Sequence, residues 1–258
     1  MNLTAKSIAV LCAAIVQGGI VLRAGATVVT SSSTDEAMVL SGSPTEVWDP
    51  KGATEISGNG LNSASAGNVE YALMYFNTAS AVSTLNSDFG AGGWTITSVS
   101  LKLTSNFATA NVYPNNNVFN EIEPGAFDIS WLSNNGWTVA SSGGVTWNTL
   151  PNYLPGVGTN AEEGLGAFNY VANGTTTFTW SLTSTSDFLN SIAAGAVSLY
   201  GTPGDNNVGY LFNSPTQGSP AVLNITAQAV PEPATLGLTV LAGAGLLHRR
   251  RRTSSGLS

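Results

Sequence analysis

The sequence predicts an all-β protein: an antiparallel β-sandwich of jelly-roll type, flanked by an N-terminal signal helix and a short C-terminal transmembrane helix. Three observations support this prediction. Apolar and polar residues alternate with a period of two, clusters of Gly and Asn separate the alternating runs, and both ends of the 258-residue chain differ in composition from the body between them.

Alternation with period two is clearest in four runs: Val99–Leu103, Phe127–Trp131, Phe178–Leu182 and Val197–Leu199. Such alternation places one face of a strand on a core and the other in water, as in antiparallel sheets. Val69–Phe76 is more continuously apolar, which predicts a central strand. The one helical candidate is Ser186–Ala194, with Asp187 as its cap.

Turn-forming clusters lie between these runs, for example Gly58-Asn59-Gly60, Gly90-Ala91-Gly92-Gly93 and Gly204-Asp205-Asn206-Asn207. Gly supplies the positive φ that tight connections need, and Asn and Asp bond to nearby backbone. Many short strands joined by such turns, without a long helical pattern, favour a sandwich or jelly roll.

The N-terminal segment, residues 1–26, has the layout of a secretory signal peptide. Lys6 precedes a mostly apolar run from Ile8 to Ile20, and Ala24-Gly25-Ala26 resembles a cleavage site. We therefore expect an exported β-domain at residues 27–229, a sorting segment at 230–252 and a short tail at 253–258. A domain of this length can bury a substantial core.

The composition of residues 27–229 excludes several classes of function. Two basic residues stand against fourteen acidic ones, a net charge of −12, which repels nucleic acid and attracts divalent cations. This segment contains neither His nor Cys. That excludes Ser-His-Asp and Cys-His catalysis, His/Cys zinc sites and disulfides.

The C-terminal segment combines three unlike features in a fixed order. Pro231, Glu232 and Pro233 form a stiff spacer, because each proline fixes φ and lacks an N–H. The uncharged run Ala234–Leu247 follows, and as a helix it reaches about 21 Å, short of a hydrocarbon core of about 30 Å. The cluster Arg249, Arg250, Arg251 and Arg252 then supplies the cytoplasmic positive charge that holds a marginal span.

This order of parts, over Val230–Arg252, closely resembles the PEP-CTERM sorting signal of bacterial exported proteins. The resemblance implies passage through the secretion translocon and recognition by an exosortase in the membrane. It also implies cleavage near the Pro-Glu-Pro triplet and release to the cell surface or an extracellular polysaccharide matrix. The alternative is an ordinary single-span anchor with a stop-transfer cluster.

The body resembles DNRLRE-type extracellular domains over about Glu70–Thr226. The motifs that carry this resemblance are Tyr71–Phe76, Ile96–Leu103, the V-T-W-N-x-x-P match Val145–Pro151, Phe178–Ala194, Leu211–Ser214 and Pro220–Leu223. It implies a jelly roll like that of carbohydrate-binding modules, in a surface or matrix protein, with room for one structural Ca²⁺.

Two kinds of ligand site follow as hypotheses. Carboxylate oxygens suit Ca²⁺, and the candidate ligands are Asp35, Glu36, Glu121, Glu123, Asp128 and Asp205, the last with Asn206 and Asn207. Tryptophans can stack on sugar rings, and Trp48, Trp94 and Trp137 lie near polar or Gly-rich segments. Trp131 and Trp180, on alternating apolar faces, are expected in the core.

We therefore expect a non-catalytic, exported surface or matrix protein with a structural or adhesive role. The runner-up is a carbohydrate-binding module attached to exopolysaccharide. A glycoside-active enzyme is the third possibility, because a pair of carboxylates can cleave glycosidic bonds. Its candidates are Glu121 and Glu123 with Asp128, then Glu162 with Glu163.

Overall fold

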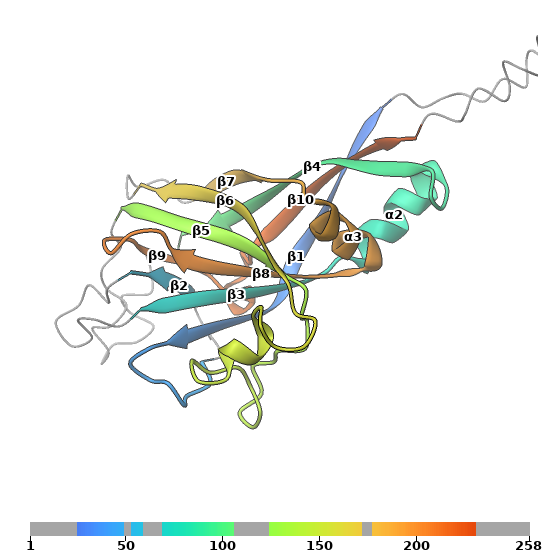
Figure 1. The fold of residues 1–258 in the computed structure, drawn as a ribbon. Helices are drawn as coiled ribbons and strands as arrows, with labels where there is room; N and C mark the ends of the chain where they lie inside the picture. Colours follow the sequence, from blue (N-terminus) through green and yellow to red (C-terminus); the bar gives the residue numbers. More distant parts are fainter. Residues whose placement is uncertain (1–24, 49–52, 59–68, 106–123, 172–176, 231–258) are drawn as a thin grey trace, which may run out of the picture. The chain divides into compact units, whose positions relative to one another are not determined.

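The computed structural model describes residues 25–48, 53–58, 69–105, 124–171 and 177–230 (Figure 1). Residues 26–228 form one compact unit. The predicted signal helix and transmembrane helix lie outside the described residues. Within the described part, no helix has the length and apolarity needed to cross a membrane.

The prediction of an all-β, antiparallel fold is confirmed. The strands are β1 (Ala26–Leu40), β2 (Ala53–Ser57), β3 (Glu70–Asn77), β4 (Trp94–Thr104), β5 (Gly125–Leu132), β6 (Glu162–Tyr170), β7 (Thr177–Leu182), β8 (Ala196–Pro203), β9 (Gly209–Asn213) and β10 (Val222–Ala229). Short helices interrupt them: α2 (Ala79–Phe89), α3 (Ser186–Ala194) and the 3₁₀ turns η3 (Leu150–Tyr153) and η4 (Pro215–Gln217).

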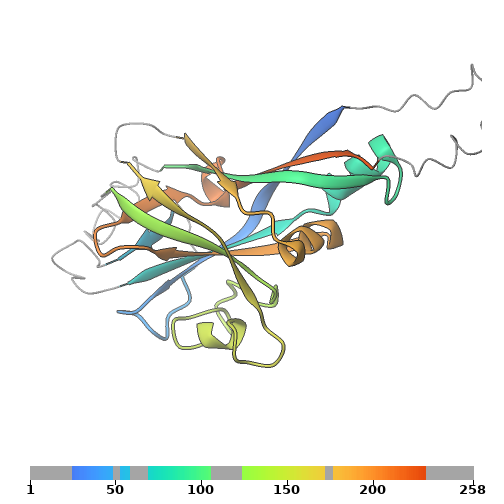
Figure 2. The same cartoon turned by 45° about the horizontal axis from the view of Figure 1, so that its top comes forward.

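Strand β1 links two parts of the sheet. Its first half, up to Ser32, pairs with β10, which continues to β4 and β7. Its second half pairs with β3, which continues to β8, β5 and β6, while β2 pairs with β3 and β9. Every pairing whose register is known is antiparallel. Figures 1 and 2 show β1 running between the two parts.

The change of partner occurs at a β-bulge. Ser33 pairs with Phe76 and Asp35 with Tyr75, so Thr34 is the extra residue. A bulge bends its strand and increases the local twist, which lets β1 leave one partner and join another. The backbone N–H of Ser33 still donates to the carbonyl of Ala221, 2.8 Å away, just before β10.

A buried carboxylate holds this crossing together. Glu36 is 2% exposed. The hydroxyl of Ser33 donates to its Oε1 at 2.7 Å, and that of Thr54 on β2 donates to its Oε2 at 2.5 Å. A backbone hydrogen bond from Ala221 adds a third donor. Glu36 therefore connects β1, β2 and the segment entering β10.

The main core draws on both parts of the sheet and on both helices. Leu101 on β4 and Ile225 on β10 belong to the same buried cluster as Met74 on β3, Ile129 on β5 and Phe188 on α3. The predicted core positions of Trp131 and Trp180 agree with this: Trp131 is buried, and Trp180 is partly buried against the same cluster.

A second buried cluster was not predicted. The alternation in β8 was expected to leave Ser198 in water, but the segment between β5 and β6 covers that face. Trp137, Val145 and Leu150 from this segment pack on Leu73 and Tyr200. Residues of β8 do alternate between the two faces of the sheet. Because both faces of β3 and β8 are covered, however, the prediction that Ser198 lies in water is wrong.

The helices only partly match the prediction. Helix α3 has the predicted bounds, but Asp187 lies in its first turn and Thr185 occupies the N-cap position. Helix α2 was missed, because five of its eleven residues, ASAVSTLNSDF, are Ser, Thr or Val, which have modest helix propensity. Burial of Ala81 and Leu85 against the core stabilises it.

We predict that Thr54→Val, which removes one donor to Glu36 at nearly constant volume, lowers the free energy of unfolding by about 2 kcal/mol at pH 8. The loss should be smaller at pH 5, where the carboxyl is neutral. Urea denaturation at both pH values measures it. Thr34→Val, at the exposed bulge residue, is the matched control. Equal effects of the two variants would contradict the role given to Glu36.

Candidate functional site

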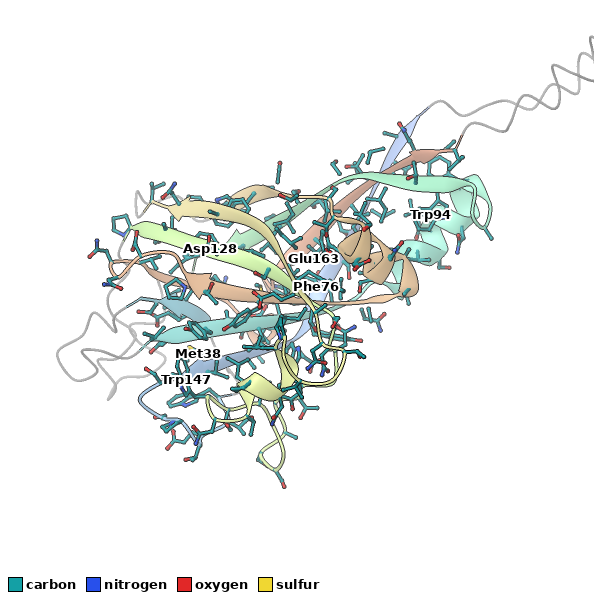
Figure 3. The ribbon with its side chains drawn as sticks, in the orientation of Figure 1. Met38, Phe76, Trp94, Asp128, Trp147 and Glu163 are labelled. Carbon is teal, nitrogen blue, oxygen red and sulfur yellow. The ribbon has the colours of Figure 1, made fainter. Side chains whose placement is uncertain are left out.

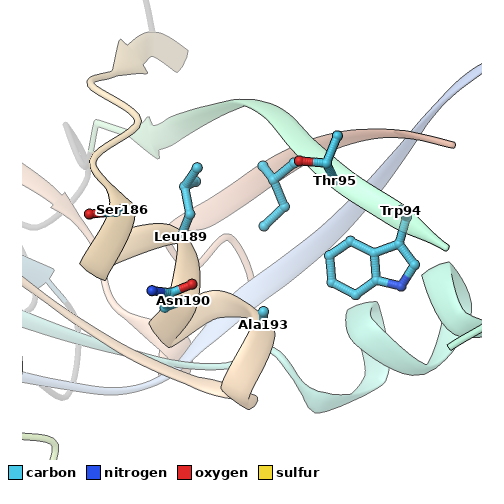
Figure 4. Close-up of a pocket in the computed structure, with 7 residues that line it drawn as sticks. Trp94, Thr95, Ser186, Leu189, Asn190 and Ala193 are labelled. Carbon is cyan, nitrogen blue, oxygen red and sulfur yellow. The ribbon is translucent and has the colours of Figure 1, made fainter. Parts of the chain in front are cut away.

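A surface pocket of about 340 Å³ lies between the start of β4 and helix α3. Figure 4 shows its walls: Trp94 and Thr95 come from the strand, and Ser186, Leu189, Asn190 and Ala193 come from the helix. Ile96 completes the lining. Among the residues that the structure describes, no charged side chain lines the pocket. Helices α2 and α3 contact each other, and Figure 1 shows them side by side.

Hydrogen bonds donated by Thr78 join the two helices beside this pocket. The Thr78 hydroxyl donates to the carbonyl of Ile192 at 2.7 Å, and its backbone N–H donates to the carbonyl of Gly195 at 2.9 Å. Thr78 precedes α2, whereas Ile192 and Gly195 lie at the end of α3. Gly195 adopts φ of 99°, a left-handed helix end that favours glycine. The end of α3 is thereby tied to the start of α2.

Trp94 is the aromatic wall of the pocket, and its indole orientation is fixed. Its Nε1–H donates to Oδ1 of Asn86 on α2 at 2.8 Å. The ring packs at the edge of the main core and is partly exposed. Trp94 therefore stays a predicted ligand platform, with part of its ring exposed.

The other two tryptophans proposed as platforms are placed differently. Trp137 is 5% exposed and donates its Nε1–H to the Ser198 hydroxyl at 3.0 Å, so its predicted exposure is wrong. The covering segment between β5 and β6 brings it onto the sheet. Trp48 is partly buried and forms an isolated bridge with Met38 on β1.

The V-T-W-N-T-L-P motif anchors that covering segment. Trp147 stacks on Tyr71 of β3, with ring centroids 4.9 Å apart. The backbone N–H of Thr146 donates to the Thr149 hydroxyl at 2.8 Å, and that of Thr149 donates to the Thr146 hydroxyl at 3.2 Å. Leu150 is buried at the start of η3. In the described structure this motif is engaged in packing.

Those acidic residues proposed for Ca²⁺ that the structure describes do not lie together in one cluster. Asp35 is exposed whereas Glu36 is buried, because neighbouring residues of β1 point to opposite faces. Asp128 lies within β5, opposite Ala167 and Thr202. Glu121 and Glu123 lie outside the described residues. In the segments that the structure describes, no three His, Cys, Asp or Glu side chains come close enough to hold a metal ion.

Asp205 already has backbone donors on both carboxylate oxygens. The N–H of Ala126 donates to Oδ2 at 2.7 Å, and those of Asn207 and Val208 donate to Oδ1 at 2.8 and 2.9 Å. These bonds, that of Ala126 first, hold the pKa of Asp205 below its usual value. Asp205 thus fastens the turn between β8 and β9 to the start of β5.

Of the carboxylates considered for glycoside chemistry, Glu162 and Glu163 are in the described part of the chain, and these two do not face one cleft. Glu162 and Glu163 are adjacent on β6, so their side chains point to opposite faces. Glu162 is exposed, and Glu163 accepts a hydrogen bond from the Thr185 hydroxyl.

Sequence reasoning missed a buried pair of glutamates. Glu55 on β2 and Glu70 on β3 are 5% and 1% exposed, and their carboxyl groups hydrogen-bond to each other. Ser57 pairs with Glu70, so Glu55 lies diagonally across the strand pair from it. A charged residue beginning the apolar run of β3 was the available signal. The pKa values of both are raised, chiefly by burial.

Sequence reasoning identified Trp94 on β4 as a candidate but missed the pocket residues on α3 that lie across from it. Ser186, Leu189 and Asn190 lie on a predicted helix, but nothing in their spacing indicated which strand would face them. No protein-family model matches the chain, and a search of curated proteins finds no similar sequence.

We predict that the protein is more stable at pH 5 than at pH 8. Burial raises the pKa of Glu36 from 4.5 to about 7, and those of Glu55 and Glu70 also lie above their ordinary value. A raised folded-state pKa gives stability that is present below the unfolded value and is lost as pH rises through the folded one. Glu36 alone corresponds to about 3 kcal/mol.

Urea denaturation across this pH range measures the decline. Glu70→Gln should make the free energy of unfolding decline less between pH 5 and pH 8, because the amide cannot ionise beside Glu55. Glu46→Gln, at an exposed carboxylate, is the control. A free energy of unfolding that rises between pH 5 and pH 8 would overturn the assignment.

Proposed function

We propose that this protein is an exported, non-catalytic component of the cell surface or extracellular matrix, sorted by its C-terminal segment. The observation that carries the proposal is the order of Pro231-Glu232-Pro233, the apolar run and the four arginines. The partners are the secretion translocon and an exosortase-type membrane enzyme. The β-domain is the part delivered, in a structural or adhesive role.

The chemistry of the β-domain supports a non-catalytic role. Residues 27–229 lack His and Cys, and their net charge is −12. Three buried acids, Glu36, Glu55 and Glu70, are enclosed and bonded to neighbouring groups. A carboxylate needs contact with a substrate to act in acid–base catalysis, and burial prevents this.

We further propose that the domain is a jelly-roll-like sandwich. The arrangement that supports this is a single main core built from the β10–β4 and the β3–β8–β5 parts of the sheet. Strand β1 contributes to both parts.

Attachment to extracellular polysaccharide is the second candidate function. The observation that favours it is the uncharged pocket at β4 and α3, with Trp94 on one wall. Aromatic rings with a few polar neighbours are common in sites that bind small polar molecules. In this case the sorting segment would deliver a carbohydrate-binding module.

The sorting proposal predicts that the full chain, expressed in its source cells, reaches the surface or medium as a form shortened at its C-terminus. Deleting residues 231–252 should leave the protein unprocessed, and Pro231→Ala with Pro233→Ala should reduce processing. Fractionation with immunoblotting and mass spectrometry of the new C-terminus measure this. Deletion of residues 253–258 is the control. An intact chain found soluble in the cytoplasm, with both ends attached, would refute the proposal.

A further inference from the structure

The pocket between β4 and α3 has an apolar floor and an uncharged polar rim. Trp94, Ile96 and Leu189 pack against the main core, so their exposed surfaces form the floor and one wall. Ser186 and Asn190 of α3 are exposed at the rim, whereas Thr95 lies between Trp94 and Ile96 on β4 and points its side chain to the opposite face of the strand. A volume of about 340 Å³ lies at the small end of the range for small-molecule sites.

The rim groups have hydrogen-bonding capacity to spare. Within the described residues, no hydrogen bond engages the side chains of Ser186 or Asn190. A hydroxyl both donates and accepts, and an amide offers two donors and an acceptor. This set matches a ligand with several hydroxyl groups, each of which also donates and accepts.

The aromatic wall is held in place before any ligand arrives. Asn86 accepts the indole N–H of Trp94, and α2 itself is tied to α3 through Thr78. A side chain already confined to one orientation loses little conformational entropy on binding. The negative face of its π system attracts polarised C–H groups, and the flat C–H face of a sugar ring presents such groups.

We propose that this pocket binds one neutral sugar ring of a polysaccharide, with the C–H face of the ring against Trp94 and its hydroxyl groups bonded to Asn190 and Ser186. Asn86 is a positioning residue that sets the indole orientation. This inference rests on the second candidate function above and gives it a site. Uronic acids and sulfated sugars are disfavoured, because no described residue of the lining is a cation and the domain carries a net charge of −12.

The test titrates the purified chain with oligomers of glucose, galactose, mannose and N-acetylglucosamine, and with oligoglucuronate, using calorimetry and tryptophan fluorescence. At least one neutral oligomer should bind and oligoglucuronate should not. Trp94→Ala should weaken binding by about tenfold or more, equivalent to about 1.4 kcal/mol, and Asn190→Ala should weaken it severalfold. Asn86→Leu should weaken binding and alter the ligand-induced change in indole emission. Asn86→Asp, which keeps the acceptor, should restore both.

Trp147→Ala and Asn148→Ala are matched controls, because Trp147 stacks on Tyr71 away from the pocket (Figure 3). Circular dichroism confirms that each variant is folded. Neutral-sugar binding that survives Trp94→Ala would overturn the site while leaving polysaccharide attachment intact. Absence of binding to every oligomer would overturn both, and oligoglucuronate binding equal to that of the best neutral oligomer would overturn the proposed selectivity. None of these results bears on sorting, which is tested separately by fractionation.

Discussion

The arrangement of this domain depends on the carboxylate of Glu36 at the bulge of β1. A strand that pairs with β10 and then with β3 must change partners within a few residues, and the bulge at Thr34 provides the bend. Bonds to Ser33, Thr54 and Ala221 hold the strand, β2 and the entry to β10 together. Because a buried acceptor that loses its donors is costly, this arrangement favours a single register at the crossing.

Covering the sheet on its second face has consequences for function. The segment carrying Trp137 and Trp147 buries aromatic rings that would otherwise be exposed beside β3 and β8. In the β4–α3 pocket, beside the main core, a partly exposed tryptophan meets uncharged polar groups. Two acidic residues are also engaged in the structure. Asp205 accepts hydrogen bonds from backbone N–H groups, and Glu36 accepts hydrogen bonds at the strand crossing.

Much of the fold could be predicted because local patterns report local structure. The alternation in β4, β5 and β7 and the bounds of α3 follow from side-chain periodicity. Helix α2 and the burial of Trp137 could not be predicted in the same way. The helix is stabilised by distant core contacts, and the tryptophan is covered by a segment whose destination is not encoded in its own periodicity. Of the pocket, only Trp94 was foreseen.

By itself the sequence determined the β class, the acidic composition of residues 27–229 without His or Cys, and the ordered features of the C-terminal segment that motivate the sorting proposal. These properties depend on which residues are present and how they are spaced along the chain. The tertiary structure alone decided that Glu55 meets Glu70, that Glu36 bridges three segments, and that α3 faces Trp94. Each of these joins residues far apart in sequence, and only the packing of strands and helices around a common core brings them together.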